Sequence, residues 1–169
     1  MQLKTYFLSD PHLGHSNNIL NWRKDFSSVE EMENVIIDNI NSLVRPKDTL
    51  ILPGDVVITR RGFEAFDKIL CENMTIIMGN HCCERDGITF RDWAGRVKHL
   101  VASREMHFKK QPSVITHIPI NFEYSGRWLY NIHGHTHDVV LEDKRYINVS
   151  CEVLGYKPIT KQQLEEMIP

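Results

Sequence analysis

Three histidines fall within five residues in the stretch NIHGHTHDVV, residues 131–140. They are His133, His135 and His137, and Gly134 separates the first from the other two. Imidazole is the commonest protein ligand for zinc-like metals, and it is also the usual group for acid–base chemistry near neutral pH. On an extended backbone all three would point to one side, whereas a loop opened by glycine would converge two of them. The spacing alone therefore leaves three interpretations open: a metal site, an acid–base site, or a polar loop with solvated histidines.

The same kinds of side chain follow other apolar runs that are typical of buried strands. Each of five such runs is followed by Asp, Asn or His: Asp10 and His12, then Asp55, then Asn80 and His81, then His117, and finally His135 and His137. In open α/β sheets, ligand sites gather at the carboxyl ends of strands. Leaving His81 aside, seven nitrogen or oxygen donors are too many for one tetrahedral zinc, and they suit two first-row metal ions that share a bridging carboxylate. Such donors fit Mn²⁺, Fe or Zn²⁺.

The elements that must position these side chains alternate between strand and helix in the front half. Hydrophobic periodicity predicts strands over Leu3–Ser9, Asp48–Asp55 and Met74–His81. It predicts helices over residues 27–44, with a capping box at Ser27 or Ser28, and over residues 62–73. The back half is strand-like over residues 97–102, 105–110, 113–118, 127–134 and 146–151, before a closing helix over residues 160–168. We expect an α/β fold with a mixed sheet, or two packed sheets with helices outside.

Composition limits the classes of protein that fit. The chain has 169 residues, 41% hydrophobic and 25% charged, with a net charge of −2. This suits one domain over residues 1–169 with a real core. The composition has no strong excess of basic residues of the kind that binds long nucleic acid. The N-terminus does not read as a secretory signal, and no segment is long enough to span a membrane, so we expect a cytoplasmic protein, in the host cytoplasm if a phage encodes it.

Five motifs give the sequence a resemblance to a known family. The blocks SDPHLGH, PGD, GNH, THIP and HGHTH occur in the order and approximate spacing of the calcineurin-like metallophosphoesterases. The chain is most similar to the small single-domain prokaryotic and phage members, and the resemblance covers nearly its whole length. It implies a four-layer β-sandwich of the α/β (α+β) class, with flanking helices.

The resemblance also assigns roles to the donors. It implies that Asp10, His12, Asp55 and His137 hold one metal ion, and that Asp55 bridges to a second, which Asn80, His117 and His135 complete. Mn²⁺ is the expected metal, with Fe, Zn²⁺ or Ni²⁺ as alternatives. It implies that His81 acts on the leaving group as the catalytic histidine.

The implied activity is that of a dinuclear-metal-dependent phosphoesterase in which a metal-bridging hydroxide attacks phosphorus. Because the chain has few insertions, we expect an open site and a small phosphodiester substrate such as a cyclic nucleotide. A phosphomonoesterase or a nucleotide pyrophosphohydrolase is the alternative with the same site. A non-catalytic scaffold or a phosphate-ligand-binding module is a more remote one. The sequence does not indicate an oligomeric state.

Two points concern residues around this site. Cys82 stands where the family usually has an acidic residue that can orient the Gly-Asn-His histidine. Either Glu84 or Asp86 takes that role, or His81 is held less firmly. His15, in the loop after the first ligands, and Arg60 and Arg127, near the PGD and HGHTH blocks, are the candidate substrate contacts. For each arginine the alternative is a solvated surface position. Other arginines near the motifs are further phosphate-clamp candidates: Arg23, Arg61 and Arg85.

Overall fold

Two β-sheets form the centre of the protein. The computed structural model describes residues 2–82 and 87–169. The first sheet has the order β4-β3-β2-β1-β9, with β1 at Thr5–Phe7, β2 at Thr49–Pro53, β3 at Asn73–Ile77, β4 at His99–Val101 and β9 at Ile159–Thr160. Strands β1 to β4 are parallel, and β9 pairs antiparallel with β1.

The second sheet has the order β5-β6-β7-β8. Its strands are β5 at Arg104–Phe108, β6 at Gln111–Ile115, β7 at Tyr130–His133 and β8 at Tyr146–Asn148. The hairpin of β5 and β6 is antiparallel, whereas β6, β7 and β8 run parallel. Each sheet therefore has a set of parallel strands that end at a common edge.

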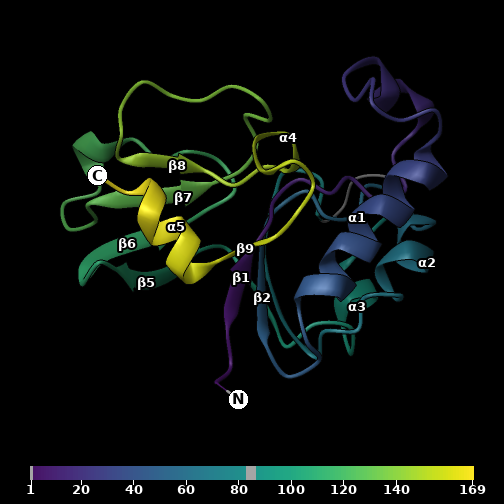
Figure 1. The fold of residues 1–169 in the computed structure, drawn as a ribbon, viewed down its shortest axis with the longest axis horizontal. Coiled ribbons are helices and arrows are strands. Elements are labelled where there is room, and N and C mark those ends of the chain that lie inside the picture. Colours follow the sequence, from purple (N-terminus) through teal and green to yellow (C-terminus); the bar gives the residue numbers. More distant parts are fainter. Residues whose placement is uncertain (1, 83–86) are drawn as a thin grey trace.

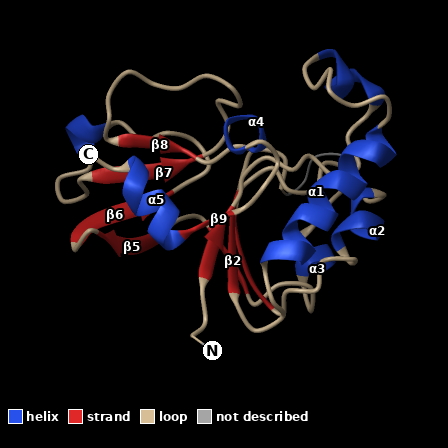
Figure 2. Ribbon diagram, in the orientation of Figure 1, coloured by secondary structure: helices blue, strands red, loops and turns tan. Residues whose placement is uncertain are grey.

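Helices gather mainly on one side of the first sheet (Figures 1 and 2). Those on that side are α1 at Val29–Leu43, α2 at Gly62–Phe66 and α3 at Phe90–Trp93. Two more helices lie in the last part of the chain: α4 at Cys151–Leu154 follows β8, and α5 at Lys161–Met167 follows β9. Two 3₁₀ turns, η1 at Asn17–Asn21 and η2 at Phe122–Tyr124, complete the described elements.

The longest helix, α1, follows from local sequence. Its apolar positions recur at helical spacing, so that Met32, Ile36 and Ile40 are buried on one face. The Ser28 hydroxyl accepts a hydrogen bond from the Glu31 amide at 3.1 Å, which caps the N-terminus and forms one half of the expected Ser28–Glu31 capping box. The Glu31 carboxylate accepts from the Ser27 amide at 2.7 Å instead of from Ser28.

Two apolar cores hold the layers together. The larger core lies between the helices and the first sheet and includes Met32, Leu50 and Trp93. The smaller lies between the two sheets and includes Phe7, Ile132 and, from α5, Leu164. The predicted mixed α/β fold with two sheets and flanking helices is confirmed.

Some sequence-based boundaries were wrong. The helix expected over residues 62–73 ends at Phe66, and a turn leads from there to β3. Cys151, expected at the end of a strand, instead begins α4. Within the described residues no helix is long and apolar enough to cross a membrane.

A short link between the sheets brings their carboxyl edges together. After β1 the chain pairs with the chain that leaves β8, because Ser9 N donates to Val149 O at 2.8 Å and Cys151 N donates to Ser9 O at 2.9 Å. The loops that follow β1 and β2 therefore meet the loops that follow β6 and β7. All the candidate ligands lie on these loops or on the loop after β3.

Candidate metal centre

The candidate ligands form two adjacent groups. One is Asp10, His12 and His137, the other is Asp55, His117 and His135, and in each group the potential ligand atoms lie within 4.8 Å of one another. The groups are neighbours, since His117 Nδ1 lies 3.9 Å from Asp10 Oδ1. The structure thus brings together side chains that are up to 127 positions apart (137 − 10) in the sequence.

Only one of the two carboxylate oxygens of Asp10 has hydrogen-bond partners among the described residues. Its Oδ2 accepts hydrogen bonds from Ser9 Oγ at 2.7 Å, Ser150 Oγ at 3.0 Å and the His135 amide at 2.9 Å. Its Oδ1 is buried and, among the described residues, has no hydrogen-bond partner. A buried carboxylate oxygen is costly unless a cation or a donor compensates it, so Oδ1 is suited to ligate a metal.

His12 shows the same pattern. Both of its ring nitrogens are buried without a hydrogen-bond partner among the described residues. Asp10 Oδ1 lies 3.6 Å from His12 Nε2, too far for a hydrogen bond. A divalent cation that binds Asp10, His12 and His137 would satisfy these atoms, and the donor set fits one.

In the second group, one ring nitrogen and two side-chain oxygens lie close together. Because a carbonyl oxygen only accepts, His117 Nδ1 carries the proton that it donates to Pro53 O at 2.9 Å. Its other nitrogen, Nε2, lies 3.2 Å from Asp55 Oδ2 and 3.0 Å from Asn80 Oδ1. A histidine ligand commonly donates its second N–H to a carbonyl or carboxylate in this way. In a neutral ring Nε2 therefore offers a lone pair to a metal beside two oxygen ligands.

Backbone conformation is unusual at the ligands themselves. Five of the seven candidates have left-handed φ angles: Asp10 (58°), His12 (56°), Asp55 (44°), His135 (69°) and His137 (50°). Non-glycine residues adopt this region rarely, although Asp and His are among those that tolerate it best. Strained backbone of this kind clusters at functional sites, where the surrounding fold holds it.

Two glycines of the motifs allow the ligands to approach the backbone. A Cβ at Gly134 would lie 2.3 Å from Asp10 Oδ2 and 1.9 Å from Ser9 Oγ. A Cβ at Gly79 would lie 2.2 Å from Asp55 Oδ1. Any larger residue at either position would push a ligand carboxylate out of place.

Charge interactions between the two kinds of ligand agree with this geometry. Burial would raise the pKa of Asp55, but the imidazole of His117 outweighs it and holds that pKa below its ordinary value. In return, although burial opposes it, the carboxylate of Asp55 raises the pKa of His117. A metal ion that binds His117 Nε2 would therefore compete with the proton that this carboxylate favours.

Two residues outside the five motifs hold the first group in place. Glu152 Oε1 lies 2.9 Å from His137 Nδ1 and also accepts from Arg23 Nε at 2.8 Å. Arg23 is 1% exposed and donates to the carbonyls of Asp10 at 2.5 Å and Pro11 at 3.0 Å. Arg23 is thus a buried structural residue, and the expectation that it clamps phosphate was wrong. Arg23 and Glu152 lie 129 positions apart, and no local pattern indicates their pairing.

The model for the family described as calcineurin-like phosphoesterase matches residues 3–166. The chain belongs to this family. An uncharacterised protein of Methanocaldococcus jannaschii is 29% identical over 177 residues, which covers 98% of this chain and 91% of that protein.

A solved structure shows the same fold. A protein of unknown function from Aquifex aeolicus superposes with a TM-score of 0.75 at 24% identity, covering 99% of this phosphoesterase and 100% of that chain. A structure described as a novel archaeal phosphodiesterase superposes with a TM-score of 0.48 at 20% identity, covering 88% of this chain and 82% of that one. The second likeness is too distant to bear on the substrate of this phosphoesterase.

The histidine expected to act in catalysis lies beside the second group. The His81 amide donates to Asp55 Oδ1 at 2.9 Å, and its ring Nε2 lies 3.9 Å from Asp55 Oδ2. Cys82 turns into the core of this phosphoesterase, where its Sγ accepts from the Gly79 amide at 3.1 Å and burial raises its pKa to about 11. Cys82 is therefore a buried, neutral thiol in the turn. The expected substitutes Glu84 and Asp86, and the clamp candidate Arg85, lie outside the described residues.

The three expected substrate contacts have different surroundings. His15 lies next to the ligands, with its ring centroid 5.5 Å from that of His12. Arg60 donates to Gly87 O at 2.9 Å and pairs with Asp92. Arg127 pairs with Glu105 and precedes β7, whereas the ligands follow that strand, so the structure does not bring Arg127 to the metal groups. Arg61 pairs with Glu33.

Proposed function

We propose that this calcineurin-like phosphoesterase is a dinuclear-metal-dependent phosphodiesterase that hydrolyses small phosphodiesters such as cyclic nucleotides. The observation that carries the proposal is the pair of adjacent donor groups, with Asp10 Oδ1 and the His12 nitrogens lacking partners among the described residues. Two divalent cations bound there, with Mn²⁺ as the first candidate, would polarise phosphoryl oxygens and lower the pKa of a water molecule.

The chain's own residues would bind the two cations and supply a proton to the leaving group. Asp10, His12 and His137 would hold one cation, and His117, His135 and Asn80 the other, with Asp55 between them. His81 is half-buried, and its backbone amide is fixed to Asp55, which leaves its ring beside the second group. Imidazole there can hold a proton near neutral pH and give it to the leaving oxygen.

Local charge supports a diester over a monoester. A cleft of about 650 Å³ opens beside the first group, and its lining includes His12 and His137. No lysine or arginine belongs to this lining in the described part of the chain, whereas Asp25, Asp138 and Glu152 do. A phosphodiester has one negative charge and a monoester up to two, so a cleft without cationic side chains favours the diester.

The test compares two chromogenic esters on one preparation. Metal-stripped protein is reloaded with Mn²⁺, the bound metal is counted, and hydrolysis of bis(p-nitrophenyl) phosphate is compared with that of p-nitrophenyl phosphate. We expect diester turnover that requires the metal. His81→Ala should keep both metals and lose about 10²- to 10⁴-fold in rate, the usual contribution of general acid catalysis. His107→Ala, at an exposed position of β5, is the matched control.

The outcomes separate the candidate functions. A preference for the monoester would overturn the diester assignment in favour of a phosphomonoesterase, and hydrolysis of nucleoside polyphosphates alone would favour a pyrophosphohydrolase. No turnover of any ester with two metals bound would refute the enzymatic proposal and favour a phosphate-ligand-binding module. Asp55→Asn should weaken both metals, and normal occupancy of both in this variant would contradict the bridging role.

A further inference from the structure

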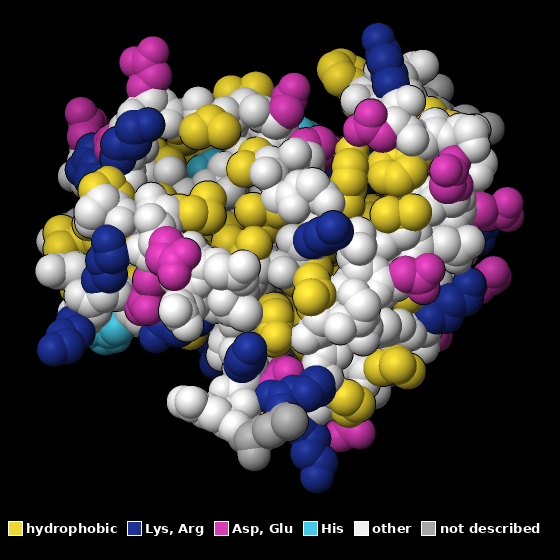
Figure 3. Space-filling view, in the orientation of Figure 1, with side chains coloured by type: hydrophobic (Ala, Val, Ile, Leu, Met, Phe, Trp, Pro, Cys, Tyr) yellow, Lys and Arg dark blue, Asp and Glu magenta, His cyan; other side chains and the backbone are white. Residues whose placement is uncertain are grey.

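The cleft beside the first metal group has a distinctive lining. His12 and His137 form part of its wall, so a group attached to a phosphate held by these ligands would extend into it. Other walls are apolar or aromatic, formed by Ile19, Trp22 and Tyr156. In Figure 3 the surface is hollowed between the η1 segment and α4, and hydrophobic side chains gather between α4 and the N-terminal part of α1.

Trp22 is the most unusual residue of this lining. Its side chain is 83% exposed, a large apolar surface next to the candidate metal centre. Its neighbour Arg23 is 1% exposed and donates to the backbone of Asp10 and Pro11, which ties the base of Trp22 to the ligand loop. Tyr156 by contrast is already engaged, since Phe26 packs edge-on against it and Arg23 lies over its ring. The indole of Trp22 is therefore an anchored aromatic face that is open to a ligand.

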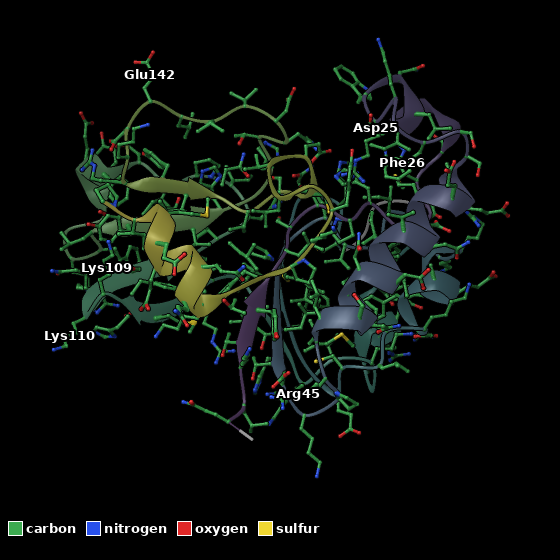
Figure 4. All side chains as sticks on the ribbon, viewed as in Figure 1. Asp25, Phe26, Arg45, Lys109, Lys110 and Glu142 are labelled. Carbon is green, nitrogen blue, oxygen red and sulfur yellow. The ribbon has the colours of Figure 1, made fainter. Side chains whose placement is uncertain are left out.

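Apart from its histidines and Thr136, the polar part of the lining consists of carboxylates. Asp25 and Asp138 are exposed carboxylates, and Figure 4 shows Asp25 on the segment just before α1. Glu152 Oε2 is buried and has no hydrogen-bond partner among the described residues. Carboxylates repel a second phosphate and attract groups that carry N–H donors. The lining therefore suits a flat group with N–H donors better than a second phosphate.

We propose that this cleft binds the nucleoside part of a phosphodiester substrate, with the base stacked on Trp22 and its amino group donating to the carboxylates of the lining. This inference rests on the proposed phosphodiesterase function and names its substrate class. The cleft volume of about 650 Å³ lies within the range of small-molecule pockets and accommodates a nucleoside. Stacking of a base on an aromatic side chain does not depend on which base it is, whereas the carboxylates favour bases with an amino group, such as adenine.

One arm of the test needs neither metal nor turnover. Adenosine and choline are titrated separately into metal-free protein, and binding is followed by tryptophan fluorescence and by saturation-transfer NMR. We expect adenosine to bind and to quench the fluorescence, and Trp22→Ala to abolish the quenching. Trp128→Phe, a change at a tryptophan that does not line the cleft, is the matched control. Binding of choline but not adenosine would overturn the proposal in favour of an alkylammonium headgroup.

The second arm measures kcat/KM on the Mn²⁺-loaded enzyme for two diesters with one leaving group. These are the p-nitrophenyl esters of adenosine 5′-monophosphate and of methyl phosphate. We expect Trp22→Ala to lower the ratio of their kcat/KM values about 5- to 150-fold, the usual effect of losing one base–aromatic stack. Trp22→Phe should restore most of the ratio, because it keeps a flat aromatic face.

The two arms distinguish a failure of the nucleoside assignment from a failure of the proposed phosphodiesterase function. If wild type hydrolyses both esters and Trp22→Ala leaves the ratio unchanged, the nucleoside assignment is refuted while the phosphodiesterase function stands. If neither ester is hydrolysed with metals bound, the proposed function fails, and the metal-free titration then decides by itself whether the cleft takes a nucleoside.

Discussion

Replacing Glu152 by glutamine tests how the buried network supports the first metal group. Glu152 Oε1 contacts His137 Nδ1 at 2.9 Å and Arg23 Nε at 2.8 Å. Burial would raise the pKa of Glu152, but His137 and Arg23 outweigh it and hold that pKa below its ordinary value, so the group is ionised at neutral pH. Glutamine keeps the shape and one acceptor oxygen but removes the charge. His137 then loses a charged partner that fixes its ring and favours Nε2 as the metal ligand.

The expected magnitude follows from this loss. Changing a hydrogen-bond partner behind a metal-binding histidine typically costs 10- to 100-fold in metal affinity, or about 1.4–2.8 kcal/mol. Truncating one member of a buried ion pair costs about 3–5 kcal/mol of stability. Glutamine should cost less, about 1–3 kcal/mol, because it still accepts one hydrogen bond and the carbonyls of Asp10 and Pro11 still accept from Arg23.

The assay titrates metal-free protein with Mn²⁺ against a chromophoric chelator, which resolves two binding constants. We expect the first group, Asp10, His12 and His137, to weaken in Glu152→Gln while the second group keeps its affinity. Glu105→Gln, which removes an exposed glutamate that pairs with Arg127, is the matched control and should change neither constant. Equal weakening at both groups, or no change at either in a folded variant, would refute the positioning role of Glu152.

Two further predictions concern backbone packing and pH. Gly134→Ala should abolish metal binding at the first group, because its Cβ would lie 2.3 Å from Asp10 Oδ2; metal counting by mass spectrometry checks this, and full occupancy would show that the loop can move aside. Asp48 accepts from Arg45 Nε at 2.9 Å and from the Lys4 amide at 2.9 Å, and mainly the contact with Arg45 holds its pKa below the ordinary value. Its stabilising contribution is therefore present above the unfolded-state pKa of about 3.9 and is lost as the pH falls below that value. Asp48→Asn should cost about 1–3 kcal/mol at pH 7, and the difference from wild type should shrink below pH 4 in urea unfolding; a difference independent of pH would exclude the charge as its source.

Local sequence determined much of the framework of this protein. Hydrophobic periodicity located α1 and every described strand except β9, because burial imposes a period of 3.6 on a helix and alternation or a continuous apolar run on a strand. It failed at residues 62–73, where the helix stops at Phe66 although the apolar spacing continues. The motifs also located the candidate ligands. Placing Asp, Asn and His directly after apolar strands costs free energy unless these side chains bind a common ligand.

Only the tertiary structure decided which of these residues meet and what holds them. The pairing of Ser9 with Ser150 joins the edges of the two sheets, and it places Asp10 against the amide of His135. The same fold buries Arg23 against Glu152 and leaves the adjacent Trp22 exposed at the cleft. It also keeps Arg127 away from the ligands, at the opposite end of β7. No local pattern indicates such contacts, because each depends on which strands lie side by side and in what register, and that is a property of the packed chain as a whole.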